Sequence, residues 1–314
     1  VAADPASLSV IALADRLART DIPVLINGPT GTGKEVLSNF IHRRSERAEK
    51  PFIAVNCAAI PSELIESELF GHMKGSFTGA VADHAGKFEQ AQNGTLFLDE
   101  VGDMSLDAQA KVLRALEEGV LTRVGGSKAI TVDVRVFAAT NKELLKEITE
   151  GRFREDFYYR LNVVPIVVPP LRERREDIPL LIRYFLSKAV GSNHGPPKTI
   201  EDGAMVRLEA LDWPGNVREL RNTVERLLIL SPGEAVRAED VDALVAGTAS
   251  GDVLGTALLN LEGFSEFKEN AEMAYIAHKL RVNDWNVSET ARRIGMPRSN
   301  LYKKIEKYGL NREE

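Results

Sequence analysis

A glycine-rich stretch near the N-terminus limits the folds open to this chain more than any other feature. It fits the pattern G-x-x-x-x-G-K and consists of Gly28, Pro29, Thr30, Gly31, Thr32, Gly33 and Lys34. A short apolar run at 23–27 precedes it, and the apolar residues at 36–41 that follow have helical spacing. A strand, a glycine loop and a helix in this order surround a nucleotide phosphate with backbone N–H groups and a lysine charge. The stretch therefore predicts an α/β domain that binds ATP or GTP.

Two adjacent carboxylates follow a second apolar run, at 95–98. They belong to Asp99 and Glu100. Downstream of a phosphate loop, such a pair at a strand end supplies one ligand for Mg²⁺ and one base for the attacking water. We therefore expect Asp99 to hold the metal and Glu100 to act as the base. Glu35 stands where a Ser or Thr hydroxyl usually reaches the metal, and its carboxylate can contact Mg²⁺ through water.

Composition narrows the class of protein. The chain has 314 residues, a formal net charge of −6 and one cysteine, Cys57, which we expect to be a small core residue. No apolar stretch approaches the ~20 residues that cross a bilayer, and no secretory signal follows Val1. These features predict a cytoplasmic protein without a membrane partner, and the missing start methionine indicates a fragment. No spacing typical of a metal site connects the histidines His42, His72, His84, His194 and His278.

The pattern of apolar residues divides the chain into four parts. Strands are expected at 23–27, 52–55, 95–98, 132–138 and 163–168, and helical spacing dominates beyond residue 170, most clearly at 178–186 and 217–230. The predicted parts are an α/β subdomain with a parallel sheet and helices on both faces at 1–170, a helical lid at 171–246, a polar linker at 247–260 and a small all-α domain at 261–314.

A glycine-bracketed turn at 71–80 carries a single aromatic residue, Phe77. Taken alone, it predicts a loop with a buried ring. The stretch nevertheless resembles the GAFTGA loop of the bacterial enhancer-binding proteins, the AAA+ activators of sigma-54 RNA polymerase of the NtrC-like family. Further motifs of that family follow in order: Asp99-Glu100, Ala139-Thr140-Asn141, Phe153-Arg154-Glu155-Asp156, Tyr159-Arg160-Leu161-Asn162, Pro170-Leu171-Arg172-Glu173-Arg174 and Trp213-Pro214-Gly215-Asn216-Val217-Arg218-Glu219-Leu220. The resemblance covers almost the whole chain, and a glutamate at position 35 is usual in it.

The resemblance implies an AAA+ P-loop ATPase that uses ATP and Mg²⁺ and forms a homo-oligomeric ring, with dimers assembling to a hexamer- or heptamer-type ring. Hydrolysis in this family converts a closed promoter complex of sigma-54 RNA polymerase into an open one. The residues implied to contact sigma-54 are Gly75, Ser76, Phe77, Thr78, Gly79 and Ala80. The family pattern has alanine where this chain has Ser76, which puts full coupling to sigma-54 in question. Most members also carry an N-terminal regulatory domain of a two-component system, and none is visible before Val1.

Several further residues receive roles from the same resemblance. Arg154 and Arg160 correspond to arginine fingers that act on the nucleotide of a neighbouring subunit. Thr140 and Asn141 correspond to sensor I, and Arg218 to sensor II. Asn56 corresponds to the residue that restrains the catalytic glutamate until the target is engaged. The helical spacing of 217–228 independently leaves Arg218 off the apolar stripe.

The C-terminal part concentrates basic residues in an otherwise acidic chain. A long helix is expected from Phe264, followed by two short helices joined at Gly295, an arrangement that fits a helix-turn-helix. Leu301, Ile305 and Tyr308 turn one face of the last helix inward. The region resembles the Fis-type module of the same family, whose first helix pairs two chains and whose last helix enters the major groove. The residues expected to contact double-stranded enhancer DNA are Arg292, Arg293, Arg298, Ser299, Asn300, Tyr302, Lys303, Lys304 and Lys307.

Other classes of function compete with transcription activation. An ATPase that remodels other proteins would share the phosphate loop but lack both the Phe77 loop and a terminal helix-turn-helix. A DNA-binding repressor with a vestigial ATP site would have lost Lys34, Glu100 or the fingers. Because this chain has all of these features, the activator is preferred. A relative that regulates the housekeeping polymerase without sigma-54 coupling is the alternative, because of Ser76.

Overall fold

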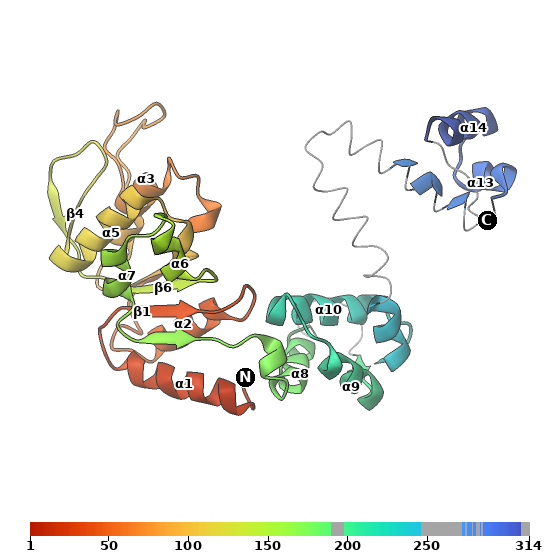
Figure 1. The fold of residues 1–314 in the computed structure, drawn as a ribbon, viewed down its shortest axis with the longest axis horizontal. Coiled ribbons are helices and arrows are strands. Elements are labelled where there is room, and N and C mark those ends of the chain that lie inside the picture. The colour runs from red at the N-terminus through yellow and green to blue at the C-terminus, as the bar shows by residue number, and fades with distance from the viewer. Residues whose placement is uncertain are drawn as a thin grey trace. The chain divides into compact units, whose positions relative to one another are not determined.

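The computed structural model describes residues 1–189, 198–245 and 272–308, apart from residues 274, 278, 281, 282 and 284. The chain divides into two compact units, Val1–Arg237 and Ala238–Glu314 (Figure 1). The expected linker at 247–260 lies outside the described residues, as do His194, His278 and the start of the helix expected from Phe264. None of the described helices is long and apolar enough to span a bilayer.

A five-stranded parallel sheet forms the centre of the first unit. Its strands are β1 (Val24–Asn27), β2 (Phe52–Asn56), β3 (Thr95–Asp99), β6 (Arg135–Thr140) and β7 (Pro165–Val167). They lie in the order β2-β3-β6-β1-β7, and every neighbouring pair is parallel. All five strands therefore end at one edge of the sheet, where open α/β sheets bind their ligands.

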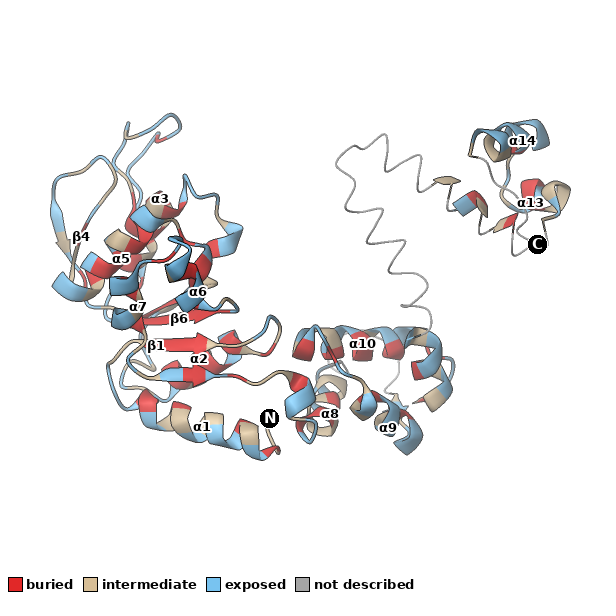
Figure 2. Ribbon diagram, in the orientation of Figure 1, coloured by how far each residue is buried: buried red, intermediate tan, exposed pale blue. Residues whose placement is uncertain are grey.

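Side chains of the sheet alternate between two buried clusters. Leu96 and Leu98 of β3 belong to one cluster, and Phe97 between them belongs to the other. Because the central strands β1, β3 and β6 are covered on both faces, they are nearly continuous apolar runs, and Figure 2 shows β1 and β6 as buried. This is the predicted α/β arrangement with helices on both faces.

Different helices cover the two faces. One face packs against α1 (Pro5–Ala18) and α2 (Lys34–Arg43). The other carries α3 (Ile65–Phe70), α4 (Lys87–Gln90), α5 (Leu106–Glu118), α6 (Leu144–Thr149) and α7 (Glu155–Leu161), together with the short 3-10 helices η1 (Cys57–Ala59) and η2 (Val101–Asp103). Buried Arg135 at the start of β6 fixes α1, because its guanidinium donates to the carbonyls of Leu17 at 2.8 Å and Ala18 at 3.4 Å. Burial lowers the pKa of Arg135 to about 10.

A helical lid completes the first unit. It consists of η3 (Leu171–Glu173), α8 (Asp177–Ala189), α9 (Asp202–Ala210) and α10 (Asn216–Leu230), with β8 (Thr199–Ile200) paired in parallel to β9 (Ala235–Val236). Figure 1 shows α8, α9 and α10 grouped together beside the layered part. The two predicted helical segments, 178–186 and 217–230, fall within α8 and α10. The β8–β9 pair was not expected.

One predicted strand begins at a different residue in the structure, and one hairpin was not predicted. The strand expected at 132–138 begins only at Arg135 and continues to Thr140. Val132 instead donates its backbone N–H to the Gly119 carbonyl at 2.8 Å, which closes the base of an antiparallel hairpin. The hairpin is formed by β4 (Val120–Thr122) and β5 (Ala129–Thr131), which are too short to show a clear apolar alternation.

The second unit contains a helix-turn-helix. Its helices α13 (Val287–Arg293) and α14 (Arg298–Lys307) are joined at Gly295, whose φ of 68° favours glycine. Asn286 caps α13 by accepting the backbone N–H of Glu289 at 3.0 Å. Leu301 is buried, and Ile305 and Tyr308 pack against the same small core, as predicted.

Candidate active site

The phosphate loop connects β1 to α2 at the carboxyl edge of the sheet. Gly28 donates its N–H to the Thr140 carbonyl at 3.2 Å, which ties the loop to β6. Gly31 has a φ of 80°, and a Cβ there would lie 2.4 Å from the Gly215 carbonyl oxygen, so only glycine fits. Lys34 is the first residue of α2 and is buried. Its ammonium donates to the Gly28 carbonyl at 2.9 Å, which places a positive charge inside the loop.

The two carboxylates predicted for metal binding and catalysis lie directly opposite this lysine. Glu100 Oε1 is 3.4 Å from the Lys34 Nζ. Glu100 itself has a φ of 52°, a left-handed conformation that costs free energy in a non-glycine residue and occurs at functional sites. Burial raises the pKa of Asp99, the charge of Glu100 raises it further, and Lys34 opposes both. Cys57 nearby is buried as expected, and burial together with the charge of Asp99 raises its pKa to about 12.

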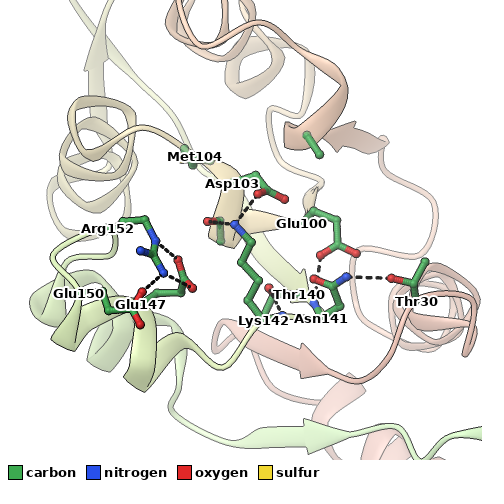
Figure 3. A network of polar contacts seen from close by, with 12 residues as sticks. Thr30, Glu100, Asp103, Met104, Thr140, Asn141, Lys142, Glu147, Glu150 and Arg152 are labelled. Atoms are coloured by element: carbon green, nitrogen blue, oxygen red, sulfur yellow. Dashed lines mark hydrogen bonds and ion pairs between the residues drawn. The ribbon is translucent and has the colours of Figure 1, made fainter. Parts of the chain in front are cut away.

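Residues at the end of β6 hold the Glu100 carboxylate. The Asn141 backbone N–H donates to Glu100 Oε2 at 3.0 Å, and the Asn141 side chain donates to Thr30 Oγ1 at 2.8 Å. Figure 3 shows this chain of contacts from Glu100 through Asn141 to the phosphate loop. Thr140 Oγ1 accepts the backbone N–H of Lys142 at 3.1 Å and so fixes the turn after the strand. Both residues predicted as sensor I, Thr140 and Asn141, therefore lie beside Glu100 and the phosphate loop.

Asn56 lies beside the site without contacting Glu100. It ends β2 and is paired in register with Asp99 of β3. Its side-chain oxygen accepts the N–H groups of Ala58 at 3.0 Å and Ala59 at 3.2 Å, and so caps η1. The contact that the family resemblance implies between Asn56 and the glutamate is not made in this structure.

The lid reaches the phosphate loop through α10. The Arg218 N–H donates to the Gly31 carbonyl at 3.3 Å, and the exposed Arg218 side chain lines a cavity of about 270 Å³ with Thr30. Asn216 is buried between the two parts: its side chain donates to the Thr30 carbonyl at 3.0 Å and accepts the Leu171 N–H at 2.8 Å. Asn216 is thus a polar connection between lid and loop.

An apolar cavity of about 350 Å³ adjoins the phosphate loop on the side of α1, α2 and α8. Val10, Phe40 and Tyr184 contribute to its walls, together with Thr32 of the loop and Arg174. Arg174 donates from Nη2 to the Thr32 carbonyl at 2.6 Å, while its buried Nε has no protein partner. An apolar cavity with one unsatisfied donor beside a phosphate loop has the character of a site for a nucleotide base and sugar.

The carboxylates beside the phosphate loop also fit Mg²⁺ bound together with a nucleotide. No group of three or more His, Cys, Asp or Glu side chains in the described part of the chain could hold a metal alone. Mg²⁺ in such sites keeps several waters and takes one or two carboxylates plus substrate phosphates. Asp99 is such a carboxylate, and Glu35 is close enough for its charge to raise the pKa of Asp99.

The two arginines predicted as fingers lie away from the phosphate loop of their own chain. Arg154 precedes α7 and forms a two-bond ion pair with Asp156, at 3.0 and 2.7 Å. Arg160 lies within α7 and donates to the Leu116 carbonyl of α5 at 2.8 Å. Neither residue contacts the nucleotide site of its own chain.

The Phe77 loop packs against the turn of the β4–β5 hairpin. Met73 and Val124 form a backbone hydrogen bond of 3.0 Å, and a Cβ at Gly125 would lie 2.6 Å from Ser76 Cβ. Within the loop, Gly75 donates to the Ala80 carbonyl at 2.8 Å. The Ser76 hydroxyl is buried there with no partner. Thr78 and Gly79 are exposed and Ala80 is buried.

Phe77 is 38% exposed, and its ring meets the edge of His72 at a centroid distance of 5.0 Å. The expectation of a buried ring, drawn from the turn alone, is therefore wrong. The loop instead presents the aromatic side chain to solvent, where it is available to a partner.

In the second unit, the cations predicted to bind DNA fall into two groups. Glu289 pairs with Arg292 at 2.6 Å and with Arg293 at 3.0 Å, and Lys304 pairs with Glu272 at 2.5 Å. Five predicted residues in the first half of α14 are exposed: Arg298, Ser299, Asn300, Tyr302 and Lys303. Lys307 is also exposed. The outward face of α14 is therefore exposed to solvent, where a nucleic acid can reach it.

Sequence reasoning assigned no role to Asn216 or Arg174. Both lie within the family motifs, and the signal that could have identified Asn216 is its residue type, because asparagine adopts the left-handed conformation more readily than most residues. Its φ is 55°. Arg174 pairs locally with Asp177 at 3.9 Å, but the sequence gives no signal for its contact with the phosphate loop, because Thr32 lies far away in the chain.

Three protein families match consecutive parts of the chain. Residues 1–167 match the Sigma-54 interaction domain, residues 172–254 the AAA+ ATPase lid domain, and residues 268–308 the bacterial regulatory proteins of the Fis family. Together with the fold and the site, these matches define a AAA+ protein with a helix-turn-helix. The chain belongs to the NtrC-like family of sigma-54-dependent transcriptional activators.

Relatives of known name are similar over nearly the whole chain. The response regulator protein PilR of Pseudomonas aeruginosa is 43% identical over 94% of this chain and 66% of its own length. The DNA-binding transcriptional regulator NtrC of Escherichia coli K12 is 44% identical over 98% of this chain and 69% of its own. The crystal structure of NtrX from Brucella abortus in complex with ATP is 38% identical, with a TM-score of 0.72, over 99% of this chain and 69% of that one. This chain thus spans about two thirds of each relative.

Proposed function

We propose that this protein uses ATP hydrolysis in a homo-oligomeric ring to convert closed complexes of sigma-54 RNA polymerase into open ones, while its helix-turn-helix binds enhancer DNA. One observation carries the proposal: Lys34, Glu100 and Asn141 converge on the phosphate loop of a chain that also exposes Phe77. The parts 1–170, 171–246 and 261–314 divide this work into hydrolysis, nucleotide sensing and DNA binding, and the setting is the cytoplasm.

Each site residue has a physical role in this proposal. Lys34 and the loop amides bind the phosphates, Asp99 holds Mg²⁺, and Glu100 accepts the proton of the attacking water. Asn141 positions Glu100, and Arg218 lies where α10 meets the loop. Arg154 and Arg160 complete the site of the neighbouring subunit, in a dimer that assembles to a hexamer- or heptamer-type ring. ATP, when bound with Mg²⁺, supplies the phosphoryl group that is transferred to water.

Two substitutions test the assignment of binding and chemistry. Lys34→Ala removes the charge inside the phosphate loop and should abolish tight ATP binding. Glu100→Gln keeps that charge but removes the base, so ATP should still bind while turnover falls by about 10²- to 10⁴-fold. Binding by fluorescence titration and phosphate release measure the two effects, with the exposed Glu49→Gln as the control. Equal loss of ATP binding in both variants would contradict the assigned roles.

Ser76, which stands where the family pattern has alanine, is the reason to keep one alternative: a relative that regulates the housekeeping polymerase without sigma-54 coupling. A binding experiment separates the two functions. Sigma-54 is mixed with the protein and an ADP–metal-fluoride mimic of the transition state. A complex that forms only with the mimic supports the activator, and no complex at any concentration supports the alternative.

A further inference from the structure

Gln109 is a fully buried polar residue in the first turn of α5. Its neighbours Ala108 and Val112 belong to the apolar cluster beneath the sheet. A buried amide is costly unless its hydrogen bonds are made. Gln109 uses both ends of its amide: Nε2 donates to the carbonyls of Met104 at 2.8 Å and Arg152 at 3.1 Å, and Oε1 accepts the Arg154 N–H at 2.8 Å.

The partners of Gln109 belong to two different functional segments. Met104 directly follows η2, the short helix that comes immediately after Glu100. The Asp103 N–H donates to the Glu100 carbonyl at 3.0 Å, so η2 and the catalytic glutamate are fixed to each other. Arg152 and Arg154 precede α7. One side chain therefore connects the backbone behind the catalytic base to the backbone of the finger arginine.

The finger segment has a second attachment, to α6. Arg152 pairs with Glu147 at 2.7 Å and with Glu150, as Figure 3 shows. In the same figure Lys142, next to Asn141, donates to the Gly102 carbonyl of η2 at 3.2 Å. The ion pairs hold the segment to α6, whereas Gln109 alone among these contacts joins Met104, the residue after η2, to Arg154.

We propose that Gln109 is a positioning residue that transmits the state of a subunit's own nucleotide site, through Met104, to Arg154 and so to the site of the neighbouring subunit. The inference rests on the proposed function, in which Arg154 acts in trans. If η2 moves as Glu100 engages the nucleotide, the Gln109 amide moves the start of α7 with it. The ring then has a physical connection between consecutive sites.

Gln109→Met tests this role, because methionine fills a similar volume without an amide. ATP affinity should stay within about twofold, since the phosphate loop is untouched. Turnover should fall by about 10- to 100-fold, the effect typical of a displacement of about 1 Å in a catalytic group. Val112→Ala is the control: Val112 lies buried on the same helix, and its truncation loses packing without removing a hydrogen bond to Met104, Arg152 or Arg154. Unchanged turnover in Gln109→Met would overturn the inference.

Mixed rings separate a finger defect from a general loss of stability. In a ring of Gln109→Met and Glu100→Gln subunits, some interfaces combine an intact base from the first with an intact finger from the second. Hydrolysis should rise above that of either variant alone. Mixing Gln109→Met with Arg154→Ala should give no gain, because neither supplies a working finger.

The outcomes also distinguish this inference from the proposed function. If Arg154→Ala recovers activity when mixed with Glu100→Gln but Gln109→Met does not, Gln109 does not position the finger, and the inference alone fails. If Arg154→Ala hydrolyses ATP like the unmodified protein, the finger assignment fails, whatever Gln109→Met shows. Light scattering confirms that each variant assembles.

Discussion

Phe77→Ala separates a residue that holds its loop together from one that contacts a partner. The ring is 38% exposed and packs edge-on against His72. Such an aromatic pair contributes about 0.5–1.5 kcal/mol, whereas truncating a fully buried phenylalanine costs about 3–5 kcal/mol. We therefore expect Phe77→Ala to lower the free energy of unfolding by about 1 kcal/mol. For a unit of this size the midpoint of thermal unfolding should fall by about 2–4 °C.

Phe88→Ala provides the matched comparison. Phe88 is buried and stacks on Phe70 with ring centroids 5.6 Å apart. Its truncation should cost about 3–5 kcal/mol, measured by the same chemical unfolding experiment. A loss of equal size in Phe77→Ala would show that the Phe77 ring supports the fold of the loop, contrary to its exposure.

The functional half of the Phe77 prediction uses two further assays. Phe77→Ala should hydrolyse ATP at a nearly normal rate, because no residue of the phosphate loop contacts it. Binding of sigma-54 in the presence of the transition-state mimic, and formation of open complexes on a sigma-54 promoter, should both be lost. A Phe77→Ala protein that still opened such a promoter would refute the proposal that Phe77 contacts sigma-54.

Three other predictions concern single side chains. Ser76→Ala removes a buried hydroxyl without a partner, so it should raise the free energy of unfolding by about 1 kcal/mol and keep or raise sigma-54 binding. A loss of stability in chemical unfolding would show that the hydroxyl has a partner. Burial lowers the pKa of His42, so the stability that this residue contributes is present above the unfolded pKa near 6.5 and is lost as the pH falls. The free energy of unfolding should therefore change with pH by at most ~1.4 kcal/mol per pH unit, and this change should be absent in His42→Gln. An identical slope in both proteins would exclude His42 as its source. Lys303→Ala should reduce the slope of log affinity for DNA against log salt concentration by about one. Lys304→Ala, which loses an ion pair with Glu272, should change that slope less. Equal slopes in the two variants would contradict this difference.

Most of the site was predictable because its chemistry depends on short segments. The phosphate loop requires glycines and a lysine at fixed spacing, and the pair Asp99 and Glu100 follows a strand that its apolar run identifies. The five parallel strands were expected near their observed places because each is a short apolar run, and the central three, β3, β6 and β1, are buried on both faces. The helix-turn-helix followed from an inward stripe and a glycine turn.

Errors arose where short elements depend on distant partners. The β4–β5 hairpin has only a few residues in each strand, and its pairing shifted the start of β6 to Arg135. Phe77 was expected to be buried when judged from its turn alone, because composition does not reveal that the loop packs through Ser76 on the hairpin and leaves the ring outside.

The sequence by itself determined the class of this protein, the identity of its phosphate loop and carboxylates, and the order of its parts. Only the tertiary structure decided that Asn216 bonds the lid to Thr30, that Lys304 pairs with Glu272, and that Gln109 connects Met104 to Arg154. The physical reason is the distance along the chain over which each interaction acts. Helix and strand periods and loop glycines act between near neighbours in the chain, whereas a buried amide finds its partners only when packing brings remote backbone groups together.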